Sequence, residues 1–187
     1  RRMALLEKVD TSEMRATLTM TLQDDNVGWL PQVATENIHV LLQAMHRYGW
    51  SGYYTRYWPI GDLDPTVAYM ARASWDATVS PRGVYEDHFD HTYGPASTQR
   101  LCQMVRMLED ATVILDLDFL SLFFPVPGIL VGNVRATKPM PEGVYHILAT
   151  YESAYTILNS LRDLPGPAGR RSNLNYWLSR MEFAIHT

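Results

Sequence analysis

The chain of 187 residues lacks several features that would assign it to a class of protein. Its single cysteine, Cys102, excludes an internal disulfide, and no Cys/His spacing resembles a zinc site. The longest apolar run, residues 119–131, contains two prolines and a glycine and is too short to span a bilayer. A Gly-x-Ser-x-Gly elbow, a phosphate-binding loop and a dinucleotide fingerprint are also absent, and no cofactor is implied.

Basic residues are in the minority, since 16 Lys and Arg stand against 20 Asp and Glu. The net charge of −4 comes without a basic stripe, so nucleic acid is not an expected partner. With 47% hydrophobic and 19% charged residues, the composition is ordinary for a soluble globular protein. The opening RRMALLEKVD is typical of a helix already under way, so we expect the natural protein to begin further upstream.

Strands alternate with helices in the first part of the chain. Alternating, threonine-rich or aromatic stretches favour strands, and apolar residues repeating on one face favour helices. The predicted elements are, in order, a strand at 15–22, a helix at 35–48, a strand at 51–56 and a helix at 65–75. Asp64 can cap the last of these helices, and Pro65 suits its first turn. This order predicts parallel βαβ packing.

From residue 80 the pattern becomes helical. The predicted helices cover residues 80–93, 96–122, 142–164 and 172–186. Ser80-Pro81 starts the first of them and Gly94-Pro95 ends it, whereas the connector 125–141 allows no assignment. We therefore predict two domains, at residues 1–79 and 80–187.

Two parallel strands do not make a stable sheet alone, because both faces and both edges of the sheet need partners. Either the helical part covers the strands, or the missing strands lie on an upstream segment or on another chain. We expect the second arrangement.

Carboxylates follow the first predicted strand. Asp24 and Asp25 come just past it, with Trp29 in the same loop. Carboxylates at the C-terminal end of a strand can serve as acid, base or nucleophile in glycoside hydrolysis, or can hold a sugar hydroxyl or a divalent cation. The alternative is an ordinary turn, which Asp and Asn favour because they hydrogen-bond to their own backbone. Both interpretations remain open from the residues alone.

The loop after the second strand combines an arginine, aromatic rings and carboxylates. Alternation places Arg56 and Trp58 on one side of the strand. If that side is the open end of the sheet, Arg56 can pair with a carboxylate and Trp58 can form a stacking floor for a sugar, with Asp62 as a further contact. The alternative is an internal pair between Arg56 and Asp62 that braces the loop. Tyr53 and Tyr54 are expected to pack.

Three stretches resemble the end of certain large glycoside hydrolases, of which the α-glucuronidases and related barrel families are the nearest. They are GWSGYYTRYW, DLDPTVAYMARASWD and SPRGVYEDHFDHTYG, and the closing NYWLSRMEFA is similar to the terminal helix of such proteins. The resemblance implies an α/β plus α fold, in which the last two βα units of a TIM-type (β/α)8 barrel precede a mainly helical C-terminal domain.

The same resemblance implies a C-terminal portion or subunit of a carbohydrate-active glycoside hydrolase. The implied catalytic candidates are Asp24 and Asp25, and the implied substrate-binding residues are Trp29, Arg56, Trp58 and Asp62. Catalytic carboxylates of these families commonly lie on earlier strands, so we expect the chain alone to be inactive. The expected partners are a carbohydrate substrate and the remainder of the barrel. The alternative is a non-catalytic helical module for interaction or homo-oligomerisation.

Overall fold

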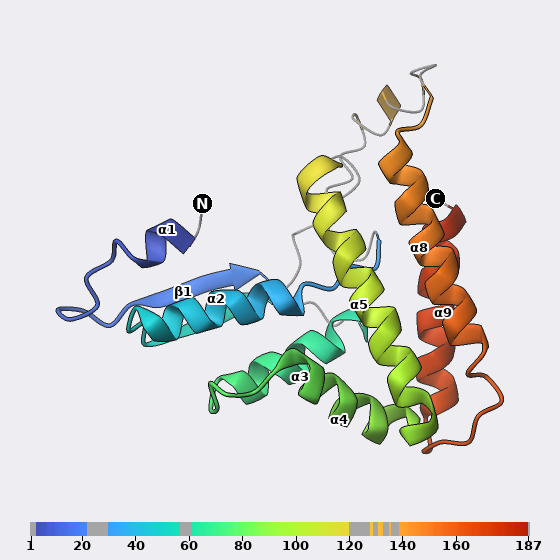
Figure 1. Cartoon of the computed structure of the whole chain (residues 1–187), viewed down its shortest axis with the longest axis horizontal. Helices are drawn as coiled ribbons and strands as arrows, with labels where there is room; N and C mark the ends of the chain where they lie inside the picture. Colours follow the sequence, from blue (N-terminus) through green and yellow to red (C-terminus); the bar gives the residue numbers. More distant parts are fainter. Residues whose placement is uncertain are drawn as a thin grey trace.

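The computed structural model describes residues 3–21, 30–56, 61–119, 128, 131–132, 135 and 139–186. Helices dominate the described chain, and the two strands both lie in its first third (Figure 1). In chain order the elements are α1 (Met3–Leu6), β1 (Thr17–Thr21), α2 (Thr35–Arg47), β2 (Gly52–Arg56), a 3-10 helix η1 (Gly61–Leu63), α3 (Asp64–Ala73), α4 (Pro81–Tyr93), α5 (Pro95–Asp118), α8 (Glu142–Asn159) and α9 (Arg170–His186). None of the helices in these ranges is both long and apolar enough to cross a bilayer.

β1 and β2 form a two-stranded parallel sheet. Thr17 pairs with Gly52 at one end of the register, and Thr21 pairs with Arg56 at the other. The connection between the strands runs through α2, so the predicted parallel βαβ unit is confirmed.

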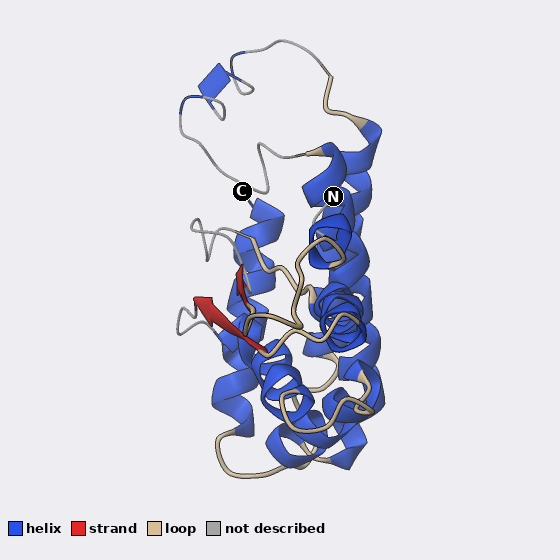
Figure 2. Cartoon of the chain, turned by 90° about the vertical axis from the view of Figure 1, so that its left-hand side faces the viewer, coloured by secondary structure: helices blue, strands red, loops and turns tan. Residues whose placement is uncertain are grey.

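The two faces of this sheet have different surroundings. Met20 and Tyr53 face the helices: Met20 is buried, and the Tyr53 hydroxyl donates a 2.6 Å hydrogen bond to the Met70 carbonyl of α3. By strand alternation the opposite face carries the exposed residues Thr17, Thr19 and Tyr54. Figure 2 shows both strands at one margin of the described chain, with helices beside them. Helices therefore cover only one face of the sheet within the described residues.

Two hydrophobic clusters form the interior. The first gathers residues of α1, β1, α2 and α3, among them Leu6, Met20, Leu42, Tyr69 and Met70. The second gathers residues of α4, α5, α8 and α9, among them Phe89, Leu108, Tyr151, Leu158 and Trp177. The clusters interlock, because α4 contributes Val84 to the first, whereas Leu30 and Val33, which precede α2, belong to the second.

The prediction of a TIM-type barrel is wrong. The described residues contain two paired strands and seven α-helices, and the sheet does not close on itself. A barrel of this type needs eight strands, each covered by its own helix. Here α5 packs against α4 and α8, and α8 packs against α9, so these helices bury their apolar faces on one another.

Candidate functional site

The C-terminal end of the sheet, defined by the last residues of β1 and β2, is the candidate site. These two residues, Thr21 and Arg56, are register partners. Segments 22–29 and 57–60 follow them directly, so both segments leave the sheet from neighbouring positions. The predicted site residues Asp24, Asp25, Trp29 and Trp58 lie outside the described residues, as does the side chain of Arg56.

Segment 22–29 rejoins the described chain at a position that α8 fixes. Leu30 and Pro31 are both buried, and Leu30 belongs to the helical cluster. The hydroxyl of Tyr151 in α8 donates a 2.9 Å hydrogen bond to the Pro31 carbonyl. Burial raises the pKa of Tyr151, so its hydroxyl remains a neutral donor at ordinary pH. The described chain that follows this segment is therefore held by a buried hydrogen bond at Pro31.

Segment 57–60 rejoins the described chain at η1, which α9 fixes through an ion pair. Arg180 donates through Nε to both oxygens of Asp62, at 3.1 and 3.0 Å, and through Nη2 to Oδ2 at 2.8 Å. The Asp62 side chain has 0% exposure and the Arg180 side chain 14%. A planar guanidinium that contacts both oxygens of a carboxylate fixes its orientation as well as its position.

Tyr176, one helical turn before Arg180, holds the neighbouring residue of η1. The Gly61 amide donates to the Tyr176 hydroxyl at 3.1 Å. Burial, together with the charge of Asp62, raises the pKa of Tyr176 to about 12. A Cβ at position 61 would lie 2.8 Å from the Tyr176 ring, so this close approach requires glycine. Two residues of α9 thus hold two consecutive residues of η1.

The structure gives Asp62 a partner that the sequence analysis did not identify. Asp62 pairs with Arg180, which lies 118 residues further along the chain. In this arrangement the Asp62 carboxylate supports the end of segment 57–60 and does not face solvent. The spacing of Tyr176 and Arg180 by four residues, within a closing helix, is the sequence signal that places both on one face.

Exposed aromatic rings lie on α9 and β2, two elements that border the candidate site. Phe183 follows Arg180 by three residues on the same face of α9, and both Phe183 and Tyr176 are partly exposed. Tyr54 lies on the uncovered face of β2 and is 61% exposed. The expectation that Tyr54 packs in the interior is therefore wrong. These rings offer flat apolar surface of the kind that stacks on a sugar.

A second polar cluster lies where α2 begins. Glu109 of α5 accepts hydrogen bonds at Oε1 from the Tyr85 hydroxyl, at 2.7 Å, and from the Glu36 amide, at 3.2 Å. Burial raises the pKa of Glu109, and it also raises the pKa of Tyr85. A hollow of about 260 Å³ lies beside the cluster. Because the carboxylate accepts from an amide in the first turn of α2, its role is to hold α2 against α5.

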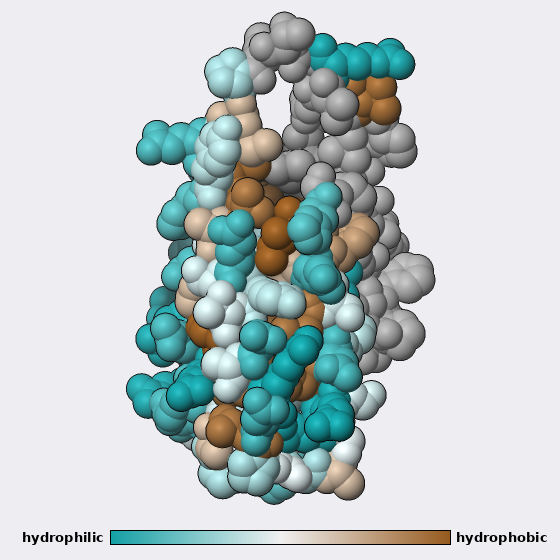
Figure 3. Space-filling view, turned by 90° about the vertical axis from the view of Figure 1, so that its right-hand side faces the viewer, coloured by the Kyte–Doolittle hydropathy of each residue, from teal (hydrophilic) through white to brown (hydrophobic). Residues whose placement is uncertain are grey.

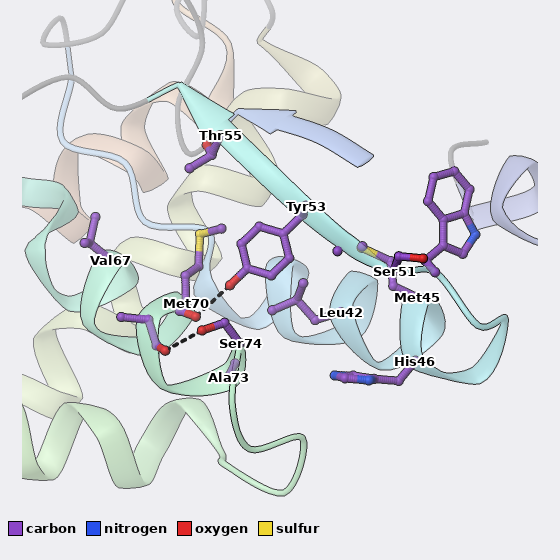
Figure 4. A pocket seen from close by; sticks show the side chains of 13 residues that line it. Leu42, Met45, His46, Ser51, Tyr53, Thr55, Val67, Met70, Ala73 and Ser74 are labelled. Atoms are coloured by element: carbon purple, nitrogen blue, oxygen red, sulfur yellow. Dashed lines mark hydrogen bonds between the residues drawn. The ribbon is translucent and has the colours of Figure 1, made fainter. Parts of the chain in front are cut away.

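A larger hollow of about 630 Å³ lies among β2, α2 and α3 (Figure 4). Most of its wall is apolar, with Leu42, Met45, Trp50, Tyr53, Val67 and Met70 among the lining residues. The Tyr53 ring projects into the region and reaches the Met70 carbonyl. The wall offers few polar groups that converge on one point, which distinguishes it from a sugar site.

Within the described ranges, no group of three or more His, Cys, Asp or Glu side chains is arranged to hold a metal ion. His88 and His91, three residues apart on α4, therefore have no further described ligand beside them. Comparison of the chain with protein-family models, with curated proteins and with solved structures found no match, so the case for a function rests on the geometry of the sheet's C-terminal end.

Proposed function

We propose that this chain is a portion of a carbohydrate-active glycoside hydrolase and binds glycan at the C-terminal end of its two-stranded sheet. One observation carries the proposal: Thr21 and Arg56 are paired, so the segments that contain the candidate carboxylates and tryptophans begin side by side. Tyr151 supports the far end of one segment, and the Asp62–Arg180 pair supports the far end of the other.

The proposed chemistry divides the work among these residues. Trp29 and Trp58 stack on sugar faces, and Arg56 orients an anionic or hydroxyl-rich group. Glycoside hydrolysis needs two carboxyl groups roughly 5–10 Å apart, on either side of the bond that breaks. Asp62 is engaged by Arg180 and is not one of the two. We expect Asp24 or Asp25 to supply one of them at most. Catalysis by the chain alone is not expected.

Calorimetric titration with an oligosaccharide that bears glucuronic acid, and with a neutral oligosaccharide of equal length, tests the proposal. Arg56→Ala and Trp58→Ala should each weaken binding by about 1–3 kcal/mol, which is roughly 5- to 150-fold. Arg56→Ala should weaken the binding of the acidic oligosaccharide more than the binding of the neutral one, because the guanidinium pairs with a carboxylate.

The chain offers matched controls for both variants. Trp75 follows the C-terminal end of α3 and is 93% exposed, and Arg72 forms an exposed pair with Asp87. Trp75→Ala and Arg72→Ala should leave glycan affinity unchanged. Unchanged affinity in the Arg56 and Trp58 variants as well would exclude this site.

A second candidate is an interaction module whose βα part completes the core of a partner. The sheet face that no described helix covers favours it, because parallel sheets are normally covered on both faces. The apolar hollow beside β2 adds a surface that suits a partner strand with alternating apolar residues. By contrast, Figure 3 shows hydrophilic side chains around scattered apolar ones on the face formed by α8 and α9, which does not favour association there.

Native mass spectrometry and sedimentation distinguish the two candidates. A stable complex that Tyr54→Asp dissociates, without loss of fold, would support the interaction module, because Tyr54 is on the uncovered sheet face. A monomer that binds the oligosaccharides would support the glycan site instead.

A further inference from the structure

The edge of β2 that faces away from β1 carries backbone groups with no strand beside them. Among the described residues the sheet contains β1 and β2 only, so β2 is paired along one edge. The Ser51 amide donates to the Ala16 carbonyl at 2.9 Å, so the backbone groups of Ser51 face β1. Because these groups alternate in direction along a strand, those of Tyr53 also face β1, whereas those of Gly52 and Tyr54 face away. The free edge of β2 is defined here by the N–H and C=O groups of Gly52 and Tyr54.

The apolar hollow of about 630 Å³ lies beside this free edge. Its lining comes from β2, α2, α3 and the residues just before β2, and includes no residue of β1. On α3 the lining residues Val67, Ala71 and Ser74 are spaced by four and three positions, which places them on one face of the helix. Figure 4 shows the Tyr53 ring reaching from β2 toward this helix. A strand added at the free edge would therefore lie over the hollow.

The free edge and the hollow together select an extended peptide. Backbone donors and acceptors that alternate along a strand are matched by another extended backbone, which is how a sheet edge recruits a peptide. Every second side chain of that peptide would point into the hollow, whose wall is mostly apolar. A small apolar molecule would fill the hollow but would leave the backbone groups of Gly52 and Tyr54 without partners.

We infer that the free edge of β2 and the adjoining hollow form a docking site for an extended partner segment with apolar residues at alternate positions. The segment adds to the sheet as a strand next to β2 and places its apolar side chains against α2 and α3. The inference goes beyond glycan binding and does not depend on it. It also names the contact through which the second candidate function acts.

Titration calorimetry with synthetic peptides of about ten residues tests the inference. A peptide that alternates valine with lysine should bind, and a peptide of the same composition with its valines in one block should bind at least about tenfold more weakly. Two further alternating peptides carry backbone N-methyl groups, one on its valines and the other on its lysines. Only one of these two should bind, because only alternate N–H groups of an added strand face β2.

Hydrogen exchange locates the bound peptide. In the free protein the Tyr53 amide, which faces β1, should exchange more slowly than the amides of Gly52 and Tyr54. The alternating peptide should slow the exchange of these two amides by about tenfold or more and leave that of Tyr53 unchanged.

A variant in the hollow provides a second test. Ala71 is exposed, so Ala71→Gln should fold, and its polar side chain should weaken peptide binding by about tenfold. Ala149→Gln, on the exposed surface of α8, is the matched control and should leave peptide binding unchanged.

Each outcome supports or overturns the docking site. Binding that requires alternation and tolerates only one set of methyl groups, together with protection of Gly52 and Tyr54, would support it. Binding of the block peptide with equal affinity, or no binding of the alternating peptide, would overturn it. Slow exchange of both amides in the free monomer would show that this chain already pairs the edge, and a dimer that protects them would assign the edge to a second copy. Both results would overturn the partner segment. Oligosaccharide titration decides the glycan site separately.

Discussion

Glu109 provides the sharpest test of how the helices hold the βα part. Its side chain, on α5, is 8% exposed and accepts from the Tyr85 hydroxyl and the Glu36 amide. Glu109→Ala removes the acceptor for both donors. A buried donor left without a partner costs roughly 1–3 kcal/mol, and the Glu36 amide is only partly buried. We therefore expect the free energy of unfolding to fall by about 2–4 kcal/mol.

Glu109→Gln separates the effect of the charge from that of the hydrogen bonds. We expect the difference in the free energy of unfolding between this variant and the wild type to depend on pH. Burial raises the pKa of Glu109; hydrogen bonds from Tyr85 and the Glu36 amide oppose this rise, and the charge of Glu36 adds to it. The folded state therefore binds the proton more tightly than the unfolded state. The stabilisation is fully present below about pH 4.3 and is lost as pH rises through the raised pKa. Glutamine cannot titrate, so the stability of the Glu109→Gln variant relative to the wild type should rise as the pH rises over this interval.

Urea unfolding followed by circular dichroism between pH 4 and pH 7.5 measures both effects. Glu86→Gln is the matched control, because Glu86 pairs with Arg82 on the surface of α4. The control should change the free energy of unfolding little, because an exposed ion pair contributes little to stability. If the wild type instead gained stability over Glu109→Gln as pH rose, the carboxylate would be stabilised by its hydrogen bonds more than it is penalised by burial. A loss below about 0.5 kcal/mol in Glu109→Ala would show that the hydrogen bonds from the Glu36 amide of α2 and the Tyr85 hydroxyl of α4 do not stabilise this packing.

Two further changes test other parts of the structure by the same urea titration. Tyr151→Phe removes the hydrogen bond to the Pro31 carbonyl and should lower the free energy of unfolding by about 1–2 kcal/mol; no change would mean that this contact does not fix the chain. Gly94 lies between α4 and α5 at φ +87°, so Gly94→Ala should cost about 1–3 kcal/mol in backbone strain. Gly52→Ala, at a position with no atom within 4 Å of an added Cβ, should have little effect, and equal losses in the two variants would refute the strain argument.

Local sequence signals were sufficient to locate most elements. The helix predicted at 35–48 is observed as Thr35–Arg47, and Gly49 follows it at φ +71°, as expected of a helix stop. Ser80 accepts from the Gly83 amide at 3.2 Å and so caps α4. These signals lie within one or two turns of the boundary they define. Asp64 is an exception, because α3 begins at Asp64 itself and Leu63 precedes it.

The architecture could not be predicted in the same way. Two strand–helix units are compatible with a parallel sheet of any size. The number of strands depends on pairing between segments that are distant in the sequence, which local patterns do not reveal. The residue types at Met20 and Tyr53 do not indicate how many strands the sheet contains. The expectation of a barrel followed from resemblance, and the described residues contradict it.

The residue types of the candidate site are a prediction from the sequence, and the contacts that hold the chain beside the site were not predicted. Arg56, Asp62 and the nearby tryptophans were identified because charged and aromatic residues cluster after a strand. The partner of Asp62 was not, since any of several arginines satisfies the same charge rule. Only the packing of α9 beside η1 selects Arg180. Whether Trp58 contacts a sugar remains a prediction.

The long separation between these contacting groups has a consequence for biosynthesis. Tyr151 lies 120 residues after Pro31, and Arg180 lies 118 residues after Asp62. A ribosome that adds roughly 5–20 residues per second needs about 6–24 s to make that length of chain. During this interval the Pro31 carbonyl lacks its buried hydrogen bond and Asp62 lacks its counter-charge. Synthesis of α9 is therefore the step after which the first third of the nascent chain can reach its final packing, and a ribosome that stalls before Arg180 leaves that part open to chaperones and proteases.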